Sequence, residues 1–385
     1  MTRRCLLLAR IAISSLSVVA ALGCRRADSR EPLDVTTLAV DLSSAPRMEL
    51  NEGQPVCGTG TAVICPISDV VAAAVEPGGR VVLANQRGLI VRFGTGGAEV
   101  DTIGGLGNGP GEYRAITALG IDSAGQLLAY DTRLRRLLTY DPEGRPVSTV
   151  NVVSPPPIVL GERIVQGGLW LFSVPPGESG REVNASLYLF HAATGTSARS
   201  AGVRMMPLTS NERSLSPIPP LFSPQPVWGV AADLTLLFSP GDSTVTMILP
   251  GGKKLRLLAA GDATPVTKAD LDRAVTTLLT PRMPEPMREQ FAAQVREARR
   301  MAPKSFPPIT AILCGSDSSF WLRGPTPPTA SMVSWYRFTT GGRLLGGLRL
   351  PASWALQLAV GDSLLITRPD SGGAVAAQWY GMRGS

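Results

Sequence analysis

The chain has 385 residues and one histidine, His191, which limits the chemistry that its side chains can perform. Zinc and iron sites usually recruit two or three imidazoles, so a metal centre with several histidines is excluded. Hydrolysis by a serine nucleophile would need Ser371 to attack, His191 to act as base and Asp242 to orient that base. Ser363 follows a similar Gly-Asp pair but has no histidine downstream to serve as its base.

The strings around these serines resemble hydrolase motifs, but their surroundings favour turns. Residues 370–373, Asp-Ser-Gly-Gly, resemble the serine segment of chymotrypsin-like proteases, and residues 361–364, Gly-Asp-Ser-Leu, resemble the serine block of a lipase family. His191 lacks the Ala-Ala-His-Cys context of those proteases, and residues 241–243 repeat Gly-Asp-Ser earlier in the chain. We therefore expect no catalytic residue in these strings, and we interpret His191 as a surface turn residue.

A repeat of about 46 residues indicates which elements carry these strings. Residues 70–85 overlay residues 116–131 at an offset of 46, and weaker copies occupy 169–195, 227–252, 309–342 and 356–380. Each copy reads as apolar strands separated by Asp/Gly turns, with an aromatic residue ending the third strand. The 41 glycines and 33 prolines fit this many turns. The sequence therefore predicts an all-β fold, a six-bladed β-propeller.

The sixth copy lacks a fourth strand, so the ring needs a strand from elsewhere to close. Residues 34–42 contain an apolar run beginning at Leu38, and we expect them to complete the sixth blade. A segment too polar for a blade, residues 263–308, separates the fourth copy from the fifth. The predicted propeller therefore spans residues 34–385 and includes this insertion.

Residues 103–113 read Ile-Gly-Gly-Leu-Gly-Asn-Gly-Pro-Gly-Glu-Tyr. This string resembles the segment between blades in bacterial six-bladed β-propeller lipoproteins and, more distantly, in NHL-repeat propellers. We interpret it as structural, because its glycines permit positive φ and Tyr113 can cap the gap between blades. No helix follows it, as a phosphate-binding loop would require.

The N-terminus resembles a bacterial lipoprotein signal: two early arginines, an apolar centre over residues 11–22, and Gly23 before Cys24. This resemblance implies a signal peptide over residues 1–23, lipidation of Cys24 and a tether over residues 24–33. The protein would then be exported and anchored in the cell envelope, at the periplasmic face of the outer membrane. Ordinary secretory cleavage, with Cys24 as a disulfide partner, remains the alternative.

Removal of residues 1–23 takes away three arginines and no acid, so the net charge falls from +7 to +4. No arginine-rich helix with interleaved aromatics remains, and we expect no nucleic-acid partner. Cys57 and Cys65 are eight residues apart in a turn-rich segment, which in an oxidising compartment favours a disulfide, although two unpaired thiols are possible. Cys314, in an apolar run, fits a buried structural thiol.

The insertion predicts two helices, the first capped by Thr267 and the second running over about residues 287–301. Arg296, Arg299 and Arg300 lie on the polar face of the second helix. They fit either a solvated face with internal ion pairs or a lid that binds an anionic ligand or acidic partner.

Two functions remain open for such a propeller. The first is a non-enzymatic binding module, held at the membrane, for an unknown envelope protein, peptide or glycan. The second is a hydrolase or lyase that uses Ca²⁺ in the axial channel, as the resemblance to other six-bladed propellers implies. Arg114, Asp122 and Arg323 are candidate binding residues by their position near the predicted channel. No metal ligand can be named from the sequence.

Overall fold

The structure is a computed structural model in which Val35–Ser385 form one compact unit. The predicted signal peptide and the predicted lipidation site Cys24 lie outside the described residues. The described residues are 35–58, 65–85, 88–97, 100–152, 158–174, 183–191, 196–205, 219–280, 283–370 and 375–384.

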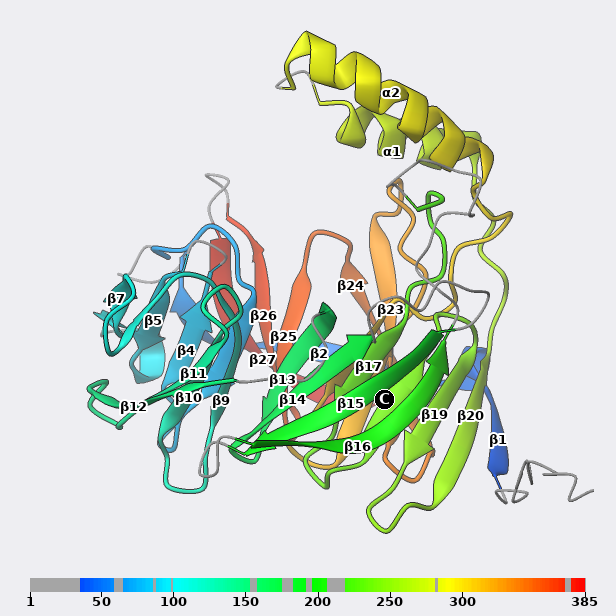
Figure 1. Cartoon of the computed structure of the whole chain (residues 1–385). Coiled ribbons are helices and arrows are strands. Elements are labelled where there is room, and N and C mark those ends of the chain that lie inside the picture. Colours follow the sequence, from blue (N-terminus) through cyan, green and yellow to red (C-terminus); the bar gives the residue numbers. More distant parts are fainter. Residues whose placement is uncertain are drawn as a thin grey trace, which may run out of the picture. The chain divides into compact units, whose positions relative to one another are not determined.

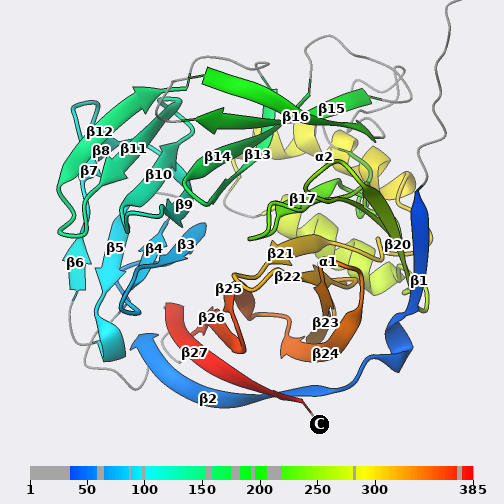
Figure 2. The same ribbon diagram turned by 90° about the horizontal axis from the view of Figure 1, so that it is seen from below.

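Six antiparallel sheets follow one another around a common axis, which confirms the predicted six-bladed propeller (Figure 2). Blade one consists of β3 (Ala72–Val75), β4 (Val81–Ala84), β5 (Ile90–Phe93) and β6 (Val100–Thr102). Blade two consists of β9 (Ile116–Ile121), β10 (Leu127–Asp131), β11 (Arg136–Tyr140) and β12 (Pro146–Asn151). Blade three consists of β13 (Ile158–Val165), β14 (Gly168–Val174), β15 (Val183–His191) and β16 (Thr196–Met205). Blade four contains β17 (Val227–Val230), β18 (Leu236–Ser239), β19 (Thr244–Ile248) and β20 (Lys254–Ala260). Blade five contains β21 (Ala311–Cys314), β22 (Ser319–Arg323), β23 (Met332–Thr339) and β24 (Leu344–Pro351). Blade six contains β25 (Ala355–Val360), β26 (Ser363–Pro369) and β27 (Val375–Gly384), together with β2 (Met48–Cys57).

The middle strands are apolar because each blade is covered on both faces by its neighbours. Every residue of β4, β10 and β18 is buried, whereas most residues of the outer strand β12 are exposed. This arrangement explains why the repeats read as continuous apolar runs rather than as alternating patterns.

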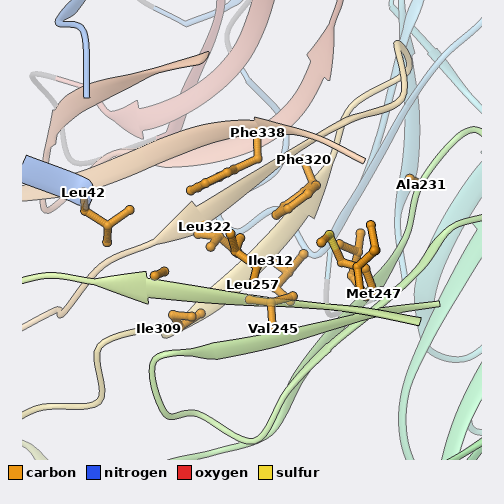
Figure 3. Close-up of a cluster of buried hydrophobic side chains, with 13 residues drawn as sticks. Leu42, Ala231, Val245, Met247, Leu257, Ile309, Ile312, Phe320, Leu322 and Phe338 are labelled. Carbon is orange, nitrogen blue, oxygen red and sulfur yellow. The ribbon is translucent and has the colours of Figure 1, made fainter. Parts of the chain in front are cut away.

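The core is divided into six hydrophobic clusters, one between each pair of neighbouring blades. Figure 3 shows the cluster in which Val245 and Met247 of blade four face Phe320 and Phe338 of blade five. The rings of Phe320 and Phe338 stack with their centroids 5.4 Å apart. Because blade six also packs on blade one, the ring is closed without a gap in the core.

The segment between blades one and two is structural, as predicted. Gly104 and Gly111 have φ values of +68° and +71°, and β7 (Gly105–Leu106) pairs with β8 (Glu112–Tyr113). Tyr113 is fully buried, and its hydroxyl accepts a hydrogen bond from the amide of Ile90 (3.1 Å) and donates one to the carbonyl of Ile103 (2.7 Å). The glycine-rich string therefore fastens two blades together.

An N-terminal strand closes the ring, as predicted, but the prediction that residues 34–42 form this strand was wrong. β1 (Thr36–Asp41) pairs in parallel with β20 and becomes a fifth strand at the outer edge of blade four. β2 completes blade six by pairing antiparallel with β27, as the two blue strands in Figure 2 show. β2 can fill this role because Met48 and Leu50 pack against the cluster between blades five and six, while most of β1 is exposed. Gly53 and Pro55 interrupt the regular pattern of β2, and the register shifts on both sides of Pro55.

The segments on either side of the closing strand contain a predicted disulfide and an unpredicted strap. Cys57, the last residue of β2, forms a disulfide with Cys65, as their spacing indicated. The strap, residues 42–47 between β1 and β2, begins with the short helix η1 (Leu42–Ser44) and crosses blade five. A second short helix, η2 (Thr95–Gly97), lies in blade one. The N-terminal part of the described chain therefore touches three successive blades.

The insertion between blades four and five contains α1 (Lys268–Leu278) and α2 (Glu285–Arg300), which lie together at one face of the propeller (Figure 1). Thr267 caps α1, and Asp270 completes a capping box with it. Asp270 also accepts hydrogen bonds from the amide and hydroxyl of Thr329, in the loop between β22 and β23. The insertion is thus tied to blade five.

Candidate functional site

A cavity of about 340 Å³ lies where the innermost strands of the six blades meet, and we call it the axial cavity. Each blade contributes residues from its first strand, namely β3, β9, β13, β17, β21 and β25. Most of the wall is formed by valine, alanine, leucine and isoleucine side chains. Such a wall suits an apolar ligand, because ligand pockets are mainly hydrophobic with a few polar groups.

The polar part of this wall is centred on blade three. Glu162 and Arg163 are consecutive residues of β13, so their side chains point to opposite sides of the strand. Arg163 lies over the ring of Trp228 at 5.6 Å, and its Nη1 donates a hydrogen bond to the carbonyl of Glu162 (2.8 Å). Burial, together with the Glu162 carboxylate, raises the pKa of Tyr130 to about 12, which places Glu162 beside blade two.

Three uncharged polar residues complete the wall. The hydroxyl of Thr117 is buried and has no hydrogen-bond partner among the described residues. Gln357 donates a hydrogen bond to the hydroxyl of Thr367 (2.8 Å). Cys314 has a free thiol, and burial raises its pKa to about 12, so the thiol stays protonated at neutral pH. Because a thiol is a much weaker nucleophile than a thiolate, Cys314 fits the predicted structural role.

The axial cavity does not provide the ligands that calcium needs. Ca²⁺ usually takes six to eight oxygen ligands, several of them carboxylates. Glu162 is the one carboxylate that lines the axial cavity, and Arg163 adds a positive charge beside it. Within the described ranges, no group of three or more His, Cys, Asp or Glu residues could hold a metal ion. The residues of the axial cavity therefore do not fit a calcium centre.

A larger groove, of about 810 Å³, separates the outer parts of blades five and six, and we call it the blade five–six groove. One wall consists of β23 and β24, and the other consists of β2 with Tyr380 of β27. Trp354, in the connection between the blades, packs against Tyr380 with 5.4 Å between ring centroids. The charged lining residues have both signs: Arg47, Glu49, Glu52 and Arg349.

The strap brings the two walls together at one end of this groove. The amide of Gly347 donates a hydrogen bond to the carbonyl of Pro46 (2.8 Å), and Arg47 forms a parallel bridge with Gly347. Residues 48–50 and 52, which follow the strap, line one wall, and residues 348–351 of β24 line the opposite wall. The groove therefore opens where β2 leaves the edge of β24.

The structure does not bring the predicted residues Arg114 and Asp122 together. Arg114 precedes β9, and its Nε donates a hydrogen bond to Asn108 in the interblade segment (3.0 Å). Asp122 follows β9 and accepts hydrogen bonds from two amides of its own turn. Between them lies β9, whose six residues span about 20 Å. Neither residue lines the axial cavity.

Arg323 comes closer to the axial cavity but does not line it. Its guanidinium lies over the ring of Trp335, a lining residue, at 5.9 Å. Burial lowers the pKa of Arg323, and its Nε is buried without a hydrogen-bond partner in the described part of the chain. Arg323 therefore supports the wall from behind.

The arginines of the second helix form the internal ion pairs that one of the two interpretations expects. Arg299 pairs with Asp272 of α1 (2.6 Å), and Arg300 pairs with Glu297 (2.6 Å). Arg296 is exposed. This geometry fits the interpretation as a solvated face with internal ion pairs.

The Gly-Asp-Ser strings at residues 241–243 and 361–363 lie in bends or turns that lead into β19 and β26, as expected. Asp242 accepts hydrogen bonds from the amide and hydroxyl of Thr244, and Asp362 pairs with Arg337 (2.8 Å). Ser371 lies outside the described residues, and His191 is described only as the last residue of β15. His191, interpreted from the sequence as a turn residue, instead lies in β15 and pairs with Thr196 of β16.

Sequence reasoning missed the residues that give both sites their character. Glu162 and Arg163 had a signal, since two opposite charges interrupt the otherwise apolar stretch 158–165. The blade five–six groove had none, because Arg47 and Gly347 are 300 positions apart in the chain. No helix in the described ranges is long and apolar enough to cross a bilayer.

Comparison with known proteins agrees with the architecture. Residues 79–159, about a fifth of the chain, match the family described as 6-bladed beta-propeller. A solved structure of a Bacteroides fragilis protein, named as an assumed exported protein, is similar in fold. Its sequence is 10% identical, and the match has a TM-score of 0.52 and covers 91% of this chain and 100% of that one. No curated protein matches the chain.

Two enzymes with solved structures are also similar in fold. A virginiamycin B lyase from Staphylococcus aureus is 10% identical, with a TM-score of 0.43, over 86% of this chain and 99% of its own. A gluconolactonase from Xanthomonas campestris is 12% identical, with a TM-score of 0.44, over the same shares. Likeness at this level carries no argument about activity. The protein is a six-bladed β-propeller, and its residues 79–159 match the family of that description.

Proposed function

We propose that this chain is an exported protein, anchored in the membrane through Cys24, that binds an extended peptide segment of an envelope protein. The proposed site is the blade five–six groove. The observation that carries the proposal is the outer edge of β24 beyond Gly347, which forms one wall of that groove and pairs with no strand of the described chain. The protein then acts as a binding module, and no catalytic step is assigned to it.

The register of β24 shows which backbone groups are available. Gly347 lies opposite Tyr336 of β23, but its amide bonds to Pro46 on the other side. Groups that face outward recur every second residue in an antiparallel strand. The amide and carbonyl of Arg349 therefore face the groove, and no strand of the described chain pairs with that edge.

Another edge of the same propeller already accepts an added strand. β1 lies on the outer edge of blade four, with six residues in register from Thr36 to Asp41. Its Leu38 and Val40 pack on the cluster between blades four and five. An extended peptide added to β24 would use the same pairing, in which backbone hydrogen bonds give affinity and side-chain pockets give specificity.

The side chains of the groove fit a peptide with mixed chemistry. Tyr336 and Trp354, both half-buried, offer aromatic surfaces for apolar side chains, and the buried Tyr380 supports Trp354. Arg349 and Glu49 lie among the exposed residues and can meet charges of either sign. The volume of about 810 Å³ is within the range of ligand sites, about 300–1,000 Å³.

The test removes the outward amide of β24. A phage-displayed library of random peptides is selected on the purified chain, and the selected peptides are measured on Arg349→Pro. Proline has no amide hydrogen and its ring blocks strand addition, so we expect binding to weaken about tenfold or more. Arg349→Ala, which keeps the amide, should bind much better than Arg349→Pro.

The matched control is Asn151→Pro in blade two. Asn151 lies opposite Arg136, as Arg349 lies opposite Ser334, and the two positions are equivalent in register. This variant should keep full peptide binding. Equal binding by wild type and Arg349→Pro, or equal loss in Asn151→Pro, would contradict the proposed site. A selection that yields no peptide bound at this groove would contradict the ligand class.

A further inference from the structure

We infer that the axial cavity is a second binding site, separate from the groove, for a short apolar peptide with a free ammonium group and a free carboxylate. This inference does not depend on the proposed function, because the two sites share no residue. It rests on two charges of β13 that form no ion pair among the described residues, on the apolar wall, and on a hydroxyl that finds no hydrogen-bond partner in the same part of the chain.

Arg163 supplies a cation that is held in place but not neutralised. Its guanidinium lies over Trp228, and one hydrogen bond to the carbonyl of Glu162 fixes it further. In the part of the chain that the structure describes, no carboxylate lies within ion-pair distance of Arg163. A guanidinium has five donors in a fixed fork, so several stay available for a ligand carboxylate.

Glu162 supplies the opposite charge a short distance away. Across the described ranges its carboxylate forms no ion pair and no side-chain hydrogen bond, and it lines the axial cavity beside blade two. Because neighbouring residues of a strand point to opposite sides, the two charged ends diverge rather than neutralise each other. The ligand that matches them carries its two charges at opposite ends of its body.

The remaining wall describes the body of that ligand. Half-buried residues such as Val165, Leu313 and Leu358 present aliphatic surface from blades three, five and six. Thr117 adds a buried hydroxyl without a partner, and an unsatisfied buried polar group is costly unless a ligand or water bonds to it. A peptide group can offer that hydroxyl a hydrogen bond. The volume of about 340 Å³ limits the ligand to a small molecule.

The alternatives fit this wall less well. A purely apolar ligand would leave both charges unsatisfied and desolvated, at a cost in free energy. A simple anion would be attracted by Arg163 but repelled by the carboxylate of Glu162. A short apolar peptide satisfies both charges and fills the apolar space between them.

The experiment compares four probes of nearly equal shape by isothermal titration calorimetry on the full-length chain. The probes are dileucine, N-acetyl-dileucine, dileucine amide and N-acetyl-dileucine amide, which carry both charges, the carboxylate only, the ammonium only and neither. Dileucine should bind most tightly, and loss of each charge should weaken binding about tenfold or more. Equal binding of all four probes, or no binding of dileucine, would overturn the inference.

Variants then assign each charge to its residue. Arg163→Gln should abolish the advantage of a free carboxylate but keep that of the ammonium, and Glu162→Gln should do the reverse. Arg349→Pro, in the groove, should leave all four affinities unchanged, so failure of the proposed function does not affect this result. Thermal unfolding confirms that each variant is folded, and Arg163→Lys keeps the charge if the glutamine variant is unstable. An unchanged ranking of the probes in folded variants would refute the assignment.

Discussion

Replacement of Tyr113 by phenylalanine tests whether the glycine-rich segment between blades one and two is a structural fastener. The hydroxyl of Tyr113 is fully buried and bonds to one main-chain amide and one main-chain carbonyl. These belong to Ile90 and Ile103, whose side chains are 0% and 1% exposed. Burial raises the pKa of Tyr113, so the hydroxyl remains a donor at all physiological pH values.

The expected cost follows from these two hydrogen bonds. A buried hydrogen bond contributes about 1 kcal/mol, and a buried group left without its partner costs about 1–3 kcal/mol. Tyr113→Phe should therefore lower the free energy of unfolding by about 2–4 kcal/mol. Equilibrium urea unfolding measures this as a lower midpoint at an unchanged slope, because the surface exposed on unfolding stays the same.

Tyr336→Phe is the matched control for this change. Tyr336 is half-buried in the blade five–six groove, and within the described residues its hydroxyl makes no hydrogen bond. Its loss should change the free energy of unfolding by less than about 0.5 kcal/mol. If Tyr113→Phe costs no more than Tyr336→Phe, the segment does not fasten the blades through this hydroxyl.

Three further predictions address closure, the insertion and the anchor. Deletion of residues 35–45 removes β1, and calorimetry should still show one cooperative unfolding transition, at a lower temperature. Deletion of residues 35–52 also opens the ring, and it should abolish the cooperative transition. Burial raises the pKa of Asp270, but hydrogen bonds from two threonines outweigh it and hold the pKa below the ordinary 3.8. The stabilisation by Asp270 is therefore complete above about pH 4 and falls as the pH drops through the lowered pKa. Asp270→Asn should lower the free energy of unfolding at neutral pH and flatten the acid part of its pH profile. An unchanged pH profile would refute this. Cys24→Ala should leave a non-lipidated precursor in the aqueous phase of a detergent partition, and labelled acyl chain on that variant would refute the anchor.

The repeat in the sequence predicts the blades well because each blade is local. Its strands are consecutive in the chain, its turns need glycine or aspartate, and its third strand ends in a buried aromatic such as Tyr140 or Phe338. The helical insertion was also predictable, since Thr267 and Asp270 form a capping signal that depends on three residues of spacing. These features are set by neighbours in sequence.

The closing strand was not predictable in the same way. β1 and β2 both offer apolar side chains at alternate positions, and the turn-forming residues Gly53 and Pro55 lie inside β2. The choice between them depends on which strand fits beside β27, more than 300 residues later. Edge pairing over this distance leaves no trace in the local pattern. The regular pattern of β1 therefore predicts the closing strand in the wrong segment.

Both candidate sites depend on this same long-range closure. The axial cavity needs the first strands of all six blades, and the blade five–six groove needs β2 as one of its walls. The strap and β2 supply Arg47, Glu49 and Glu52 to the groove while β2 completes the ring. Ring closure and groove formation are therefore one structural event. A chain whose β2 is displaced from β27 loses the groove wall with the closing strand, so peptide binding there should disappear together with cooperative unfolding, whereas removal of β1 should leave the groove in place.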